Sequence, residues 1–169
     1  MMRRALKLWQ RILLLQLLFL VGCATQLAPA YDKNVVDSLN SCSIDAMTLF
    51  AVMSSGTKAQ DFATRADRYS NLIGRLDALA LAAGARPMPK NKVTDSINRF
   101  LEKRGTTVLS DDDATPPSAQ AIRQISVTLS KMRDTDQKQG ITAYEVIAFK
   151  GQASIYFDQA ITYENFLQR

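Results

Sequence analysis

The sequence predicts an all-α fold, and three observations lead to this prediction. Apolar residues recur every three or four positions along nearly all of residues 31–169, which is the spacing of one helix face. Glycines, prolines and capping residues interrupt this pattern where helices would end. No run of strand length competes with it. We therefore expect a single domain over residues 31–169, an antiparallel four-helix bundle of two αα-hairpins with a short crossover helix.

The first helix is predicted over residues 31–53. Gly56 follows it as a residue that readily adopts the left-handed conformation of a helix C-cap. The apolar face of this helix comprises Tyr31, Val35, Leu39, Cys42, Ala46, Leu49 and Met53.

The second helix is predicted to begin at Thr57, because Thr57 and Gln60 have the spacing of a capping box. Gly84 ends it, and Pro87 prevents its continuation. The junction of residues 54–57 is short enough to make the first two helices an antiparallel hairpin. The apolar stripe of the second helix comprises Phe62, Ala66, Tyr69, Ile73, Leu76, Ala80 and Ala83.

The middle of the chain connects the two hairpins. A shorter helix over residues 92–104 would be the crossover, and residues 105–116 form the longest stretch without a helical pattern. The next helix is predicted to start at Thr115, with Pro116 in its first turn, and to end at Gly140. Its apolar stripe comprises Ile122, Ile125, Leu129 and Met132.

The last helix is predicted to begin with a second capping box, from Thr142 to Glu145. Its apolar seam comprises Val146, Phe149, Ala153, Tyr156, Ala160, Tyr163 and Leu167. Four more apolar residues are expected to widen the buried face of this helix: Ile147, Ile155, Phe157 and Ile161. We therefore expect this helix to lie centrally in the bundle.

The composition excludes several classes of functional site. The chain has 169 residues with no His and two Cys, which excludes Ser-His-Asp triads, His-ligated metals and Cys₄ zinc sites. The net charge is +5, but four basic residues within residues 1–22 supply most of it. The nearly neutral remainder argues against a nucleic-acid-binding surface. No motif for catalysis or phosphate binding is present, so we expect no enzyme, cofactor or metal.

The N-terminal segment has the pattern of a secretory signal peptide. Residues 1–11 carry only positive charges, and residues 12–21 are apolar apart from Gln16. This apolar run is too short for a transmembrane helix, which needs about 20 such residues.

The next residues, Leu20-Val21-Gly22-Cys23, resemble the lipobox of bacterial lipoproteins. The resemblance implies a diacylglyceryl thioether on Cys23, cleavage between Gly22 and Cys23, and acylation of the new amino terminus, for example with palmitate. Residues 1–22 would then be the signal peptide and residues 23–30 a lipidated tether. The presence of Ala24 rather than Asp implies the outer membrane of a Gram-negative bacterium, on its periplasmic face.

Cys42 is the thiol that remains once Cys23 is lipidated, and three roles are open for it. Its position on an apolar face predicts a small buried side chain. An intermolecular disulfide is the second role, because an odd cysteine in an oxidising compartment can pair between chains. A catalytic thiol is the third, although no His can act as its base.

The acidic residues suggest no catalytic pair. Asp111-Asp112-Asp113 lacks the alternation of a calcium loop, so we expect a solvated loop, with a weak cation or basic-partner contact as the alternative. Glu145 belongs to its capping box, and no spacing brings Glu102 and Glu164 together for acid–base work.

The cationic and aromatic residues also receive structural interpretations. Arg65, Arg68 and Arg75 share part of a helix surface that we expect to be solvated. The aromatic residues have helical spacing and are expected in the core rather than along a ligand groove; they are Tyr31, Tyr69, Tyr144, Tyr156, Tyr163 and Phe166.

The lipoprotein resemblance and the lack of chemical motifs together suggest a function. We expect a non-enzymatic component of a cell-envelope assembly that meets the membrane through its lipid anchor and binds an envelope protein. In architecture it resembles helical pilotins and accessory lipoproteins of secretion systems, which hold an amphipathic segment in a groove. The alternatives are a carrier of a small hydrophobic ligand and an immunity or exclusion-type protective lipoprotein. A homo-oligomer also stays open, and no nucleic acid is expected.

Replacing the lipobox cysteine tests the processing prediction. We expect Cys23→Ser to abolish lipid labelling and to leave an unprocessed precursor, because a hydroxyl cannot form the thioether. Metabolic labelling with a radioactive fatty acid and the mobility of the protein on a denaturing gel are the measurements. Labelling of the variant at the wild-type level would contradict the lipobox assignment.

Overall fold

The computed structural model describes residues 28–87 and 115–168, and this part of the chain is helical with no strand. Its elements are α2 (Lys33–Val52), the 3₁₀ helix η1 (Ala59–Thr64), α3 (Ala66–Gly84), α5 (Pro117–Gln139) and α6 (Ala143–Phe166). The predicted all-α class is therefore confirmed for the described residues. The crossover helix predicted over residues 92–104 lies outside them.

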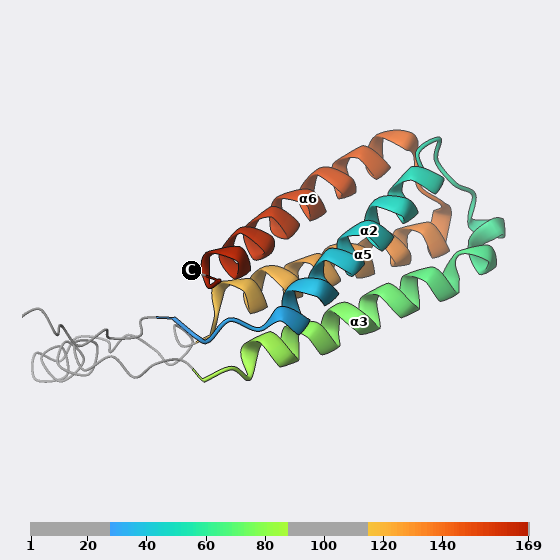
Figure 1. Ribbon diagram of the computed structural model, residues 1–169. Helices are drawn as coiled ribbons and strands as arrows, with labels where there is room; N and C mark the ends of the chain where they lie inside the picture. Colours follow the sequence, from blue (N-terminus) through green and yellow to red (C-terminus); the bar gives the residue numbers. More distant parts are fainter. Residues whose placement is uncertain (1–27, 88–114, 169) are drawn as a thin grey trace, which may run out of the picture.

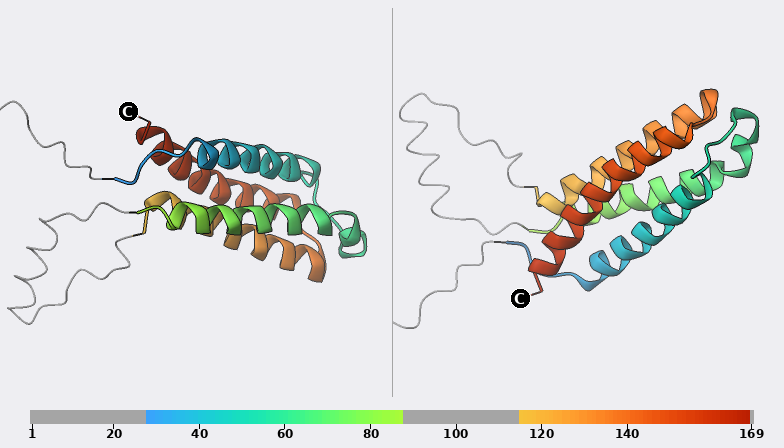
Figure 2. Two further views of the ribbon diagram at one scale, coloured as in Figure 1. Left: turned by 60° about the horizontal axis from the view of Figure 1, so that its bottom comes forward. Right: turned by 90° about the horizontal axis from the view of Figure 1, so that it is seen from above.

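The helices pack side by side, and each α-helix contacts two others. α5 packs against both α3 and α6, and α2 packs against the same two helices from another side. Figure 2 shows that the described chain begins at the end of the bundle where α3 ends, α5 begins and the C-terminus lies. The opposite end, here called the distal end, carries η1 and the turn between α5 and α6.

Local sequence signals account for most helix ends. The Asp32 carboxylate caps α2 by accepting a hydrogen bond from the Asn34 amide at 2.9 Å. α5 begins at Pro117, two residues later than predicted, with Pro116 as its N-cap. Thr142 and Glu145 form the predicted capping box of α6, with both reciprocal bonds present, so this prediction is confirmed.

The capping box predicted at Thr57 is wrong. The chain forms η1 rather than the first turns of a long helix, and α3 begins only at Ala66. The Thr57 hydroxyl cannot cap a helix because it donates a hydrogen bond to Asp136 and accepts one from the Ile141 amide. The Thr57 side chain, on which the capping box depends, is therefore engaged in a tertiary contact instead.

The core consists of apolar side chains from all four α-helices. Leu39, Leu76 and Leu129 are completely buried, and Tyr69 is the largest fully buried side chain. The apolar faces predicted for α2, α3 and α5 supply most of these residues. Burial of a leucine side chain contributes roughly 1.5–3 kcal/mol, so these faces supply much of the driving force for docking the helices.

The predicted central position of α6 is wrong. Ile147 and Ile155 are 67% and 59% exposed, whereas Val146, Ala153 and Phe157 are buried. α6 packs against α5 and α2 and leaves its outer face to solvent. The predicted seam is therefore confirmed at Val146, Ala153 and Ala160, which are buried. Periodicity overestimated the width of the buried face, because apolar residues also lie on the outer side of this helix.

One helix of the described part, α2, is long and apolar enough to cross a membrane, judged by length and composition alone. A helix buried in the core of a bundle can have the same length and apolar composition. Val35, Leu39, Ala46 and Phe50 of α2 are buried against the other helices, which accounts for its apolar character.

Two neighbouring residues of α6 test the corrected position of this helix. Phe157 is 3% exposed and Ile155 is 59% exposed. We expect Phe157→Ala to lower the free energy of unfolding by about 3–5 kcal/mol through loss of buried area and creation of a cavity. Ile155→Ala should change it by less than about 0.5 kcal/mol. Urea denaturation followed by circular dichroism measures both, and equal effects would mean that α6 is rotated from this orientation.

Candidate functional site

Two ion pairs are buried in the bundle, one at each end of α3. Arg65, which precedes α3, pairs with Asp136 of α5 at the distal end. Arg86, which follows α3, pairs with Glu164 of α6 at the other end. Both carboxylates are 0% exposed. A buried charge without a partner costs several kcal/mol, so both pairs impose strict positions on the helices that carry them.

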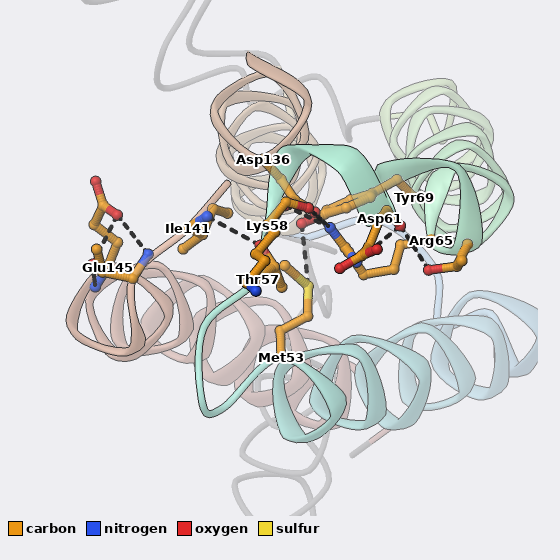
Figure 3. Close-up of polar contacts among 11 residues, drawn as sticks. Met53, Thr57, Lys58, Asp61, Arg65, Tyr69, Asp136, Ile141 and Glu145 are labelled. Carbon is orange, nitrogen blue, oxygen red and sulfur yellow. Dashed lines mark hydrogen bonds and ion pairs between the residues drawn. The ribbon is translucent and has the colours of Figure 1, made fainter. Parts of the chain in front are cut away.

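The distal pair is the centre of a polar cluster (Figure 3). The Arg65 guanidinium donates two hydrogen bonds to the Asp136 carboxylate, at 2.9 Å from Nε and 2.8 Å from Nη2. Its remaining donors reach the backbone carbonyl oxygens of Asp61 and Lys58, at 3.0 and 3.2 Å. The Thr57 hydroxyl also donates to Asp136. The cluster thus satisfies its buried polar groups internally.

The helix dipole adds a reason for this pairing. Asp136 lies in the last turn of α5, where the carbonyl end of the helix disfavours a negative charge. The Arg65 guanidinium offsets this effect, and the same hydrogen bonds raise the pKa of Arg65 above its ordinary value. Arg65 therefore stays cationic at every physiological pH.

Tyr69 is fully buried beside the cluster. Its hydroxyl donates to the Met53 sulfur at 3.2 Å, and its ring stacks on that of Phe62 with the ring centroids 6.2 Å apart. Burial, followed by the nearby charge of Asp136, raises the pKa of Tyr69 far above its ordinary value. A phenol in this environment stays neutral and is not a general base.

Two glycine turns meet beside this cluster. Gly56 and Gly140 both have positive φ, of 86° and 82°, as expected for residues at helix ends. The Thr57 amide donates to the Ile141 carbonyl oxygen at 2.7 Å, and the Ile141 amide donates to Thr57 Oγ1 at 3.0 Å. A methyl group at Gly140 would overlap the Thr57 carbonyl oxygen. The turns therefore pack backbone to backbone, which only glycine permits here.

An open depression of about 840 Å³ lies over these turns at the distal end. Its lining includes the backbone of both glycine turns, and four charged side chains of both signs line it beside the Arg65 cluster: Lys58, Asp61, Arg68 and Glu145. Lys58, Asp61 and Arg68 are exposed. The depression is therefore a polar surface of mixed charge rather than an apolar cavity.

The pair at the opposite end ties three helices together. Arg86 Nη1 donates to Glu164 at 2.8 Å, Nη2 donates to the other carboxylate oxygen, and Nη2 also reaches the Ser118 hydroxyl at 3.2 Å. Ser118 lies at the start of α5, and Glu164 lies in the last turn of α6. Arg86 thereby links the end of α3 to the start of α5 and, across the bundle, to the last turn of α6.

The structure differs from the sequence interpretation at Arg65 and Glu164. Arg65 is not on a solvated face; it is 8% exposed and paired. Arg75 binds Asp45 and Ser41 of α2 at the surface, while Arg68 is exposed as predicted. Glu164, for which the sequence suggested no specific role, is fully buried and paired with Arg86.

Cys42 is a free thiol that lies 1% exposed on the apolar face of α2, as predicted for a small buried side chain. Burial raises its pKa, which keeps it in the unreactive thiol form at neutral pH. An intermolecular disulfide through Cys42 would require local unfolding of α2.

The remaining predicted site residues divide into two groups. Gly22, Cys23, Glu102 and the triplet Asp111-Asp112-Asp113 lie outside the described residues. Glu145 acts in its capping box, where hydrogen bonds from the Thr142 amide and hydroxyl lower its pKa. Within residues 28–87 and 115–168, no three Cys, Asp or Glu side chains are close enough to hold a metal ion.

The aromatic residues do not share one location. Tyr69 is in the core, Tyr31, Tyr156 and Tyr163 are half-buried, and Tyr144 is 81% exposed. Phe166 is 59% exposed. They therefore line no common groove, and the expectation that all of them belong to the core is wrong for Tyr144 and Phe166.

The sequence carries a signal for the two buried carboxylates. Asp136 follows Met132 by four positions and so continues the apolar stripe of α5. Glu164 follows Ala160 by the same interval. An acid at a position where an apolar residue is expected indicates a buried charge that needs a partner. Its partner arginine, however, is more than 70 residues away in each case.

Two aspartates of α5 test the importance of the distal pair. Asp136 is completely buried, whereas Asp134 makes an exposed pair with Arg133. We expect Asp136→Asn to lower the free energy of unfolding by about 3–5 kcal/mol, because it leaves the Arg65 charge buried and uncompensated. Asp134→Asn should cost less than about 0.5 kcal/mol. Similar midpoints of urea denaturation for the two variants would show that the pair does not control stability.

No family model, no curated protein and no solved structure matches the chain. A function for the distal end is therefore inferred from its own residues and from the resemblance of residues 20–23 to a lipobox.

Proposed function

We propose that this chain is a lipoprotein anchored through Cys23 in the outer membrane of a Gram-negative bacterium, facing the periplasm. In this proposal it is a non-enzymatic accessory or structural component of a cell-envelope assembly, and it binds an envelope protein through the depression at its distal end. The lipobox supports the anchor, and the position of the depression supports the binding surface.

We also infer the finer architecture, an antiparallel four-helix bundle built from two αα-hairpins. The packing of each helix against two others supports this arrangement. Consecutive helices also run in opposite directions in Figure 1. In a bundle of this kind, short turns lie together at one end, which suits the meeting of the two glycine turns.

The single observation that carries the proposed function is the separation of the chain's entry point from the depression. The described chain enters at one end of the bundle, and the depression lies at the other end. Residues 24–30 reach at most about 25 Å when extended, whereas α2, with its 20 residues, is about 30 Å long. An anchor at Cys23 would therefore hold the entry end near the bilayer and leave the distal end accessible to a partner.

The chemistry of the depression favours a protein partner over the alternatives. Lys58 and Arg68 present positive charge, Asp61 and Glu145 present negative charge, and the turns add backbone carbonyl and amide groups. Mixed charge of this kind gives specificity to protein contacts. A carrier of a hydrophobic ligand would need a predominantly apolar cavity. An immunity or exclusion role would use the same kind of surface and is a special case of protein binding.

We propose no catalytic role for the buried acids. Asp136 and Glu164 are each held by two hydrogen bonds from an arginine. This arrangement stabilises the carboxylate form and leaves no space for a substrate.

In-cell photo-cross-linking tests the proposal. A photoreactive amino acid would replace Lys58 in the depression or, as a matched control, the exposed Lys131 of α5. We expect a defined envelope protein to be cross-linked from position 58 and not from position 131, because only position 58 lies at the proposed interface. Mass spectrometry of the cross-linked band identifies the protein.

The anchor is tested in the same experiment by adding Cys23→Ser. We expect the cross-link from position 58 to fall at least tenfold, since a chain without its lipid is not held beside its partner. An unchanged cross-link would show that binding does not need the anchor. Equal cross-linking from positions 58 and 131, or none from either, would contradict the distal-end binding surface.

A further inference from the structure

The outer face of α6 is an apolar surface that no other element of the described chain covers. Tyr144, Ile147 and Ile155 are 81%, 67% and 59% exposed. At 3.6 residues per turn, these three residues lie within about 80° of one another around the helix. Gly151 and Asp158 lie within the same sector, so the face is a stripe along α6 rather than three separate side chains.

We infer that this stripe, defined by Tyr144, Ile147, Gly151, Ile155 and Asp158, is the contact surface for a second copy of the same chain. The two α6 helices would cross in antiparallel orientation at Gly151, around a two-fold axis. A two-fold axis requires a surface that complements itself, because each residue i that contacts j also has j contacting i. The spacing of the stripe meets this requirement.

The pairing follows from the positions of the residues relative to Gly151. Ile147 and Ile155 stand four residues on either side of it, so Ile147 of one copy meets Ile155 of the other. Tyr144 and Asp158 stand seven residues on either side, so the phenol of one copy meets the carboxylate of the other. The phenol can donate a hydrogen bond to that carboxylate, which is the only charged side chain in the stripe.

The charge of Asp158 selects the antiparallel orientation. In a parallel pair, each stripe residue would meet its own copy, and Asp158 would lie against a second Asp158. Like charges at an apolar contact are unfavourable. In the described part of the chain, Asp158 takes part in no ion pair, and Tyr144 has no hydrogen-bond partner. Antiparallel crossing gives both groups a partner.

Gly151 allows the two backbones to approach closely. A Cβ atom added at this position would have no atom within 4 Å, so nothing in the folded chain requires glycine there. Glycine in a helix interior destabilises the helix relative to alanine. The open surroundings of Gly151, which Gly74 of α3 shares, permit a close crossing, and the residues on either side of Gly151 select this position for it.

The exposed apolar area would supply the centre of a dimer interface rather than the whole of it. The exposed fractions of Tyr144, Ile147 and Ile155 correspond to on the order of 350 Å². A standard interface buries roughly 800 Å² per partner, of which the apolar centre is only a part. The polar residues that flank the stripe on α6 would supply the rim.

Two glycines provide a matched pair of variants for the test. Gly74 of α3 resembles Gly151, since it is exposed, lies inside a helix and has no atom within 4 Å of an added Cβ. Two full-length chains with different affinity tags would be co-expressed, and the second tag would be measured after purification of the first in mild detergent. We expect Gly151→Glu to reduce recovery at least tenfold, because it places two like charges at the crossing point. Gly74→Glu should leave recovery at the wild-type level.

Both variants should keep the wild-type circular dichroism spectrum and melting temperature or exceed them, which separates loss of contact from loss of folding. Undiminished recovery of Gly151→Glu would overturn the assignment of this surface. No recovery with the wild-type chain would overturn the second copy as its occupant. Neither outcome depends on the partner proposed at the distal end.

Disulfide trapping tests the orientation. Chains carrying Ile147→Cys and Ile155→Cys would be expressed separately and together in a Cys42→Ser background, then oxidised. We expect a cross-linked dimer when I147C and I155C are mixed, and none when I147C is present alone. A cross-linked dimer of I147C expressed alone, or no cross-linked dimer in the mixture, would overturn the antiparallel pairing.

Discussion

The buried pair between Arg65 and Asp136 is the constraint on which the distal end of this protein depends. A guanidinium and a carboxylate without access to water are costly unless each finds its partner in good geometry. Here the geometry is a two-point contact, and it draws in Thr57 and the carbonyl oxygens of residues 58 and 61. The 3₁₀ helix, the delayed start of α3 and the closure of the glycine turns all accommodate this pair.

The second pair, between Arg86 and Glu164, fixes the position of the C-terminal end of α3. Arg65 and Arg86 stand at opposite ends of α3 and pair with acids on two different helices, α5 and α6. A shift of α3 by one turn would break both pairs at once, whereas an apolar face alone would tolerate such a shift far better. The ion pairs thus set the register of the helices, and the apolar core supplies the driving force for docking them.

Much of this fold could be predicted from the sequence, because helices are local. Periodicity located α2, α3, α5 and α6, and glycines and caps located most of their ends. Prediction failed where a distant residue competed with a local signal. Thr57 has a capping-box pattern but is held by Asp136 and Ile141. The sequence predicted the buried seam of α6 but not the width of its buried face, since Ile147 and Phe157 are equally apolar and only packing distinguishes them.

The contact between the glycine turns has a consequence for the order in which the molecule folds. Thr57 and Ile141 are separated by 84 positions in the chain, so their hydrogen bonds close a long loop at a considerable entropic cost. The contacts between α2 and α3 and between α5 and α6 close much shorter loops, so we expect them to form earlier. The distal depression therefore exists only after all four helices have docked. A partner bound there, as proposed above, would distinguish finished molecules from folding intermediates.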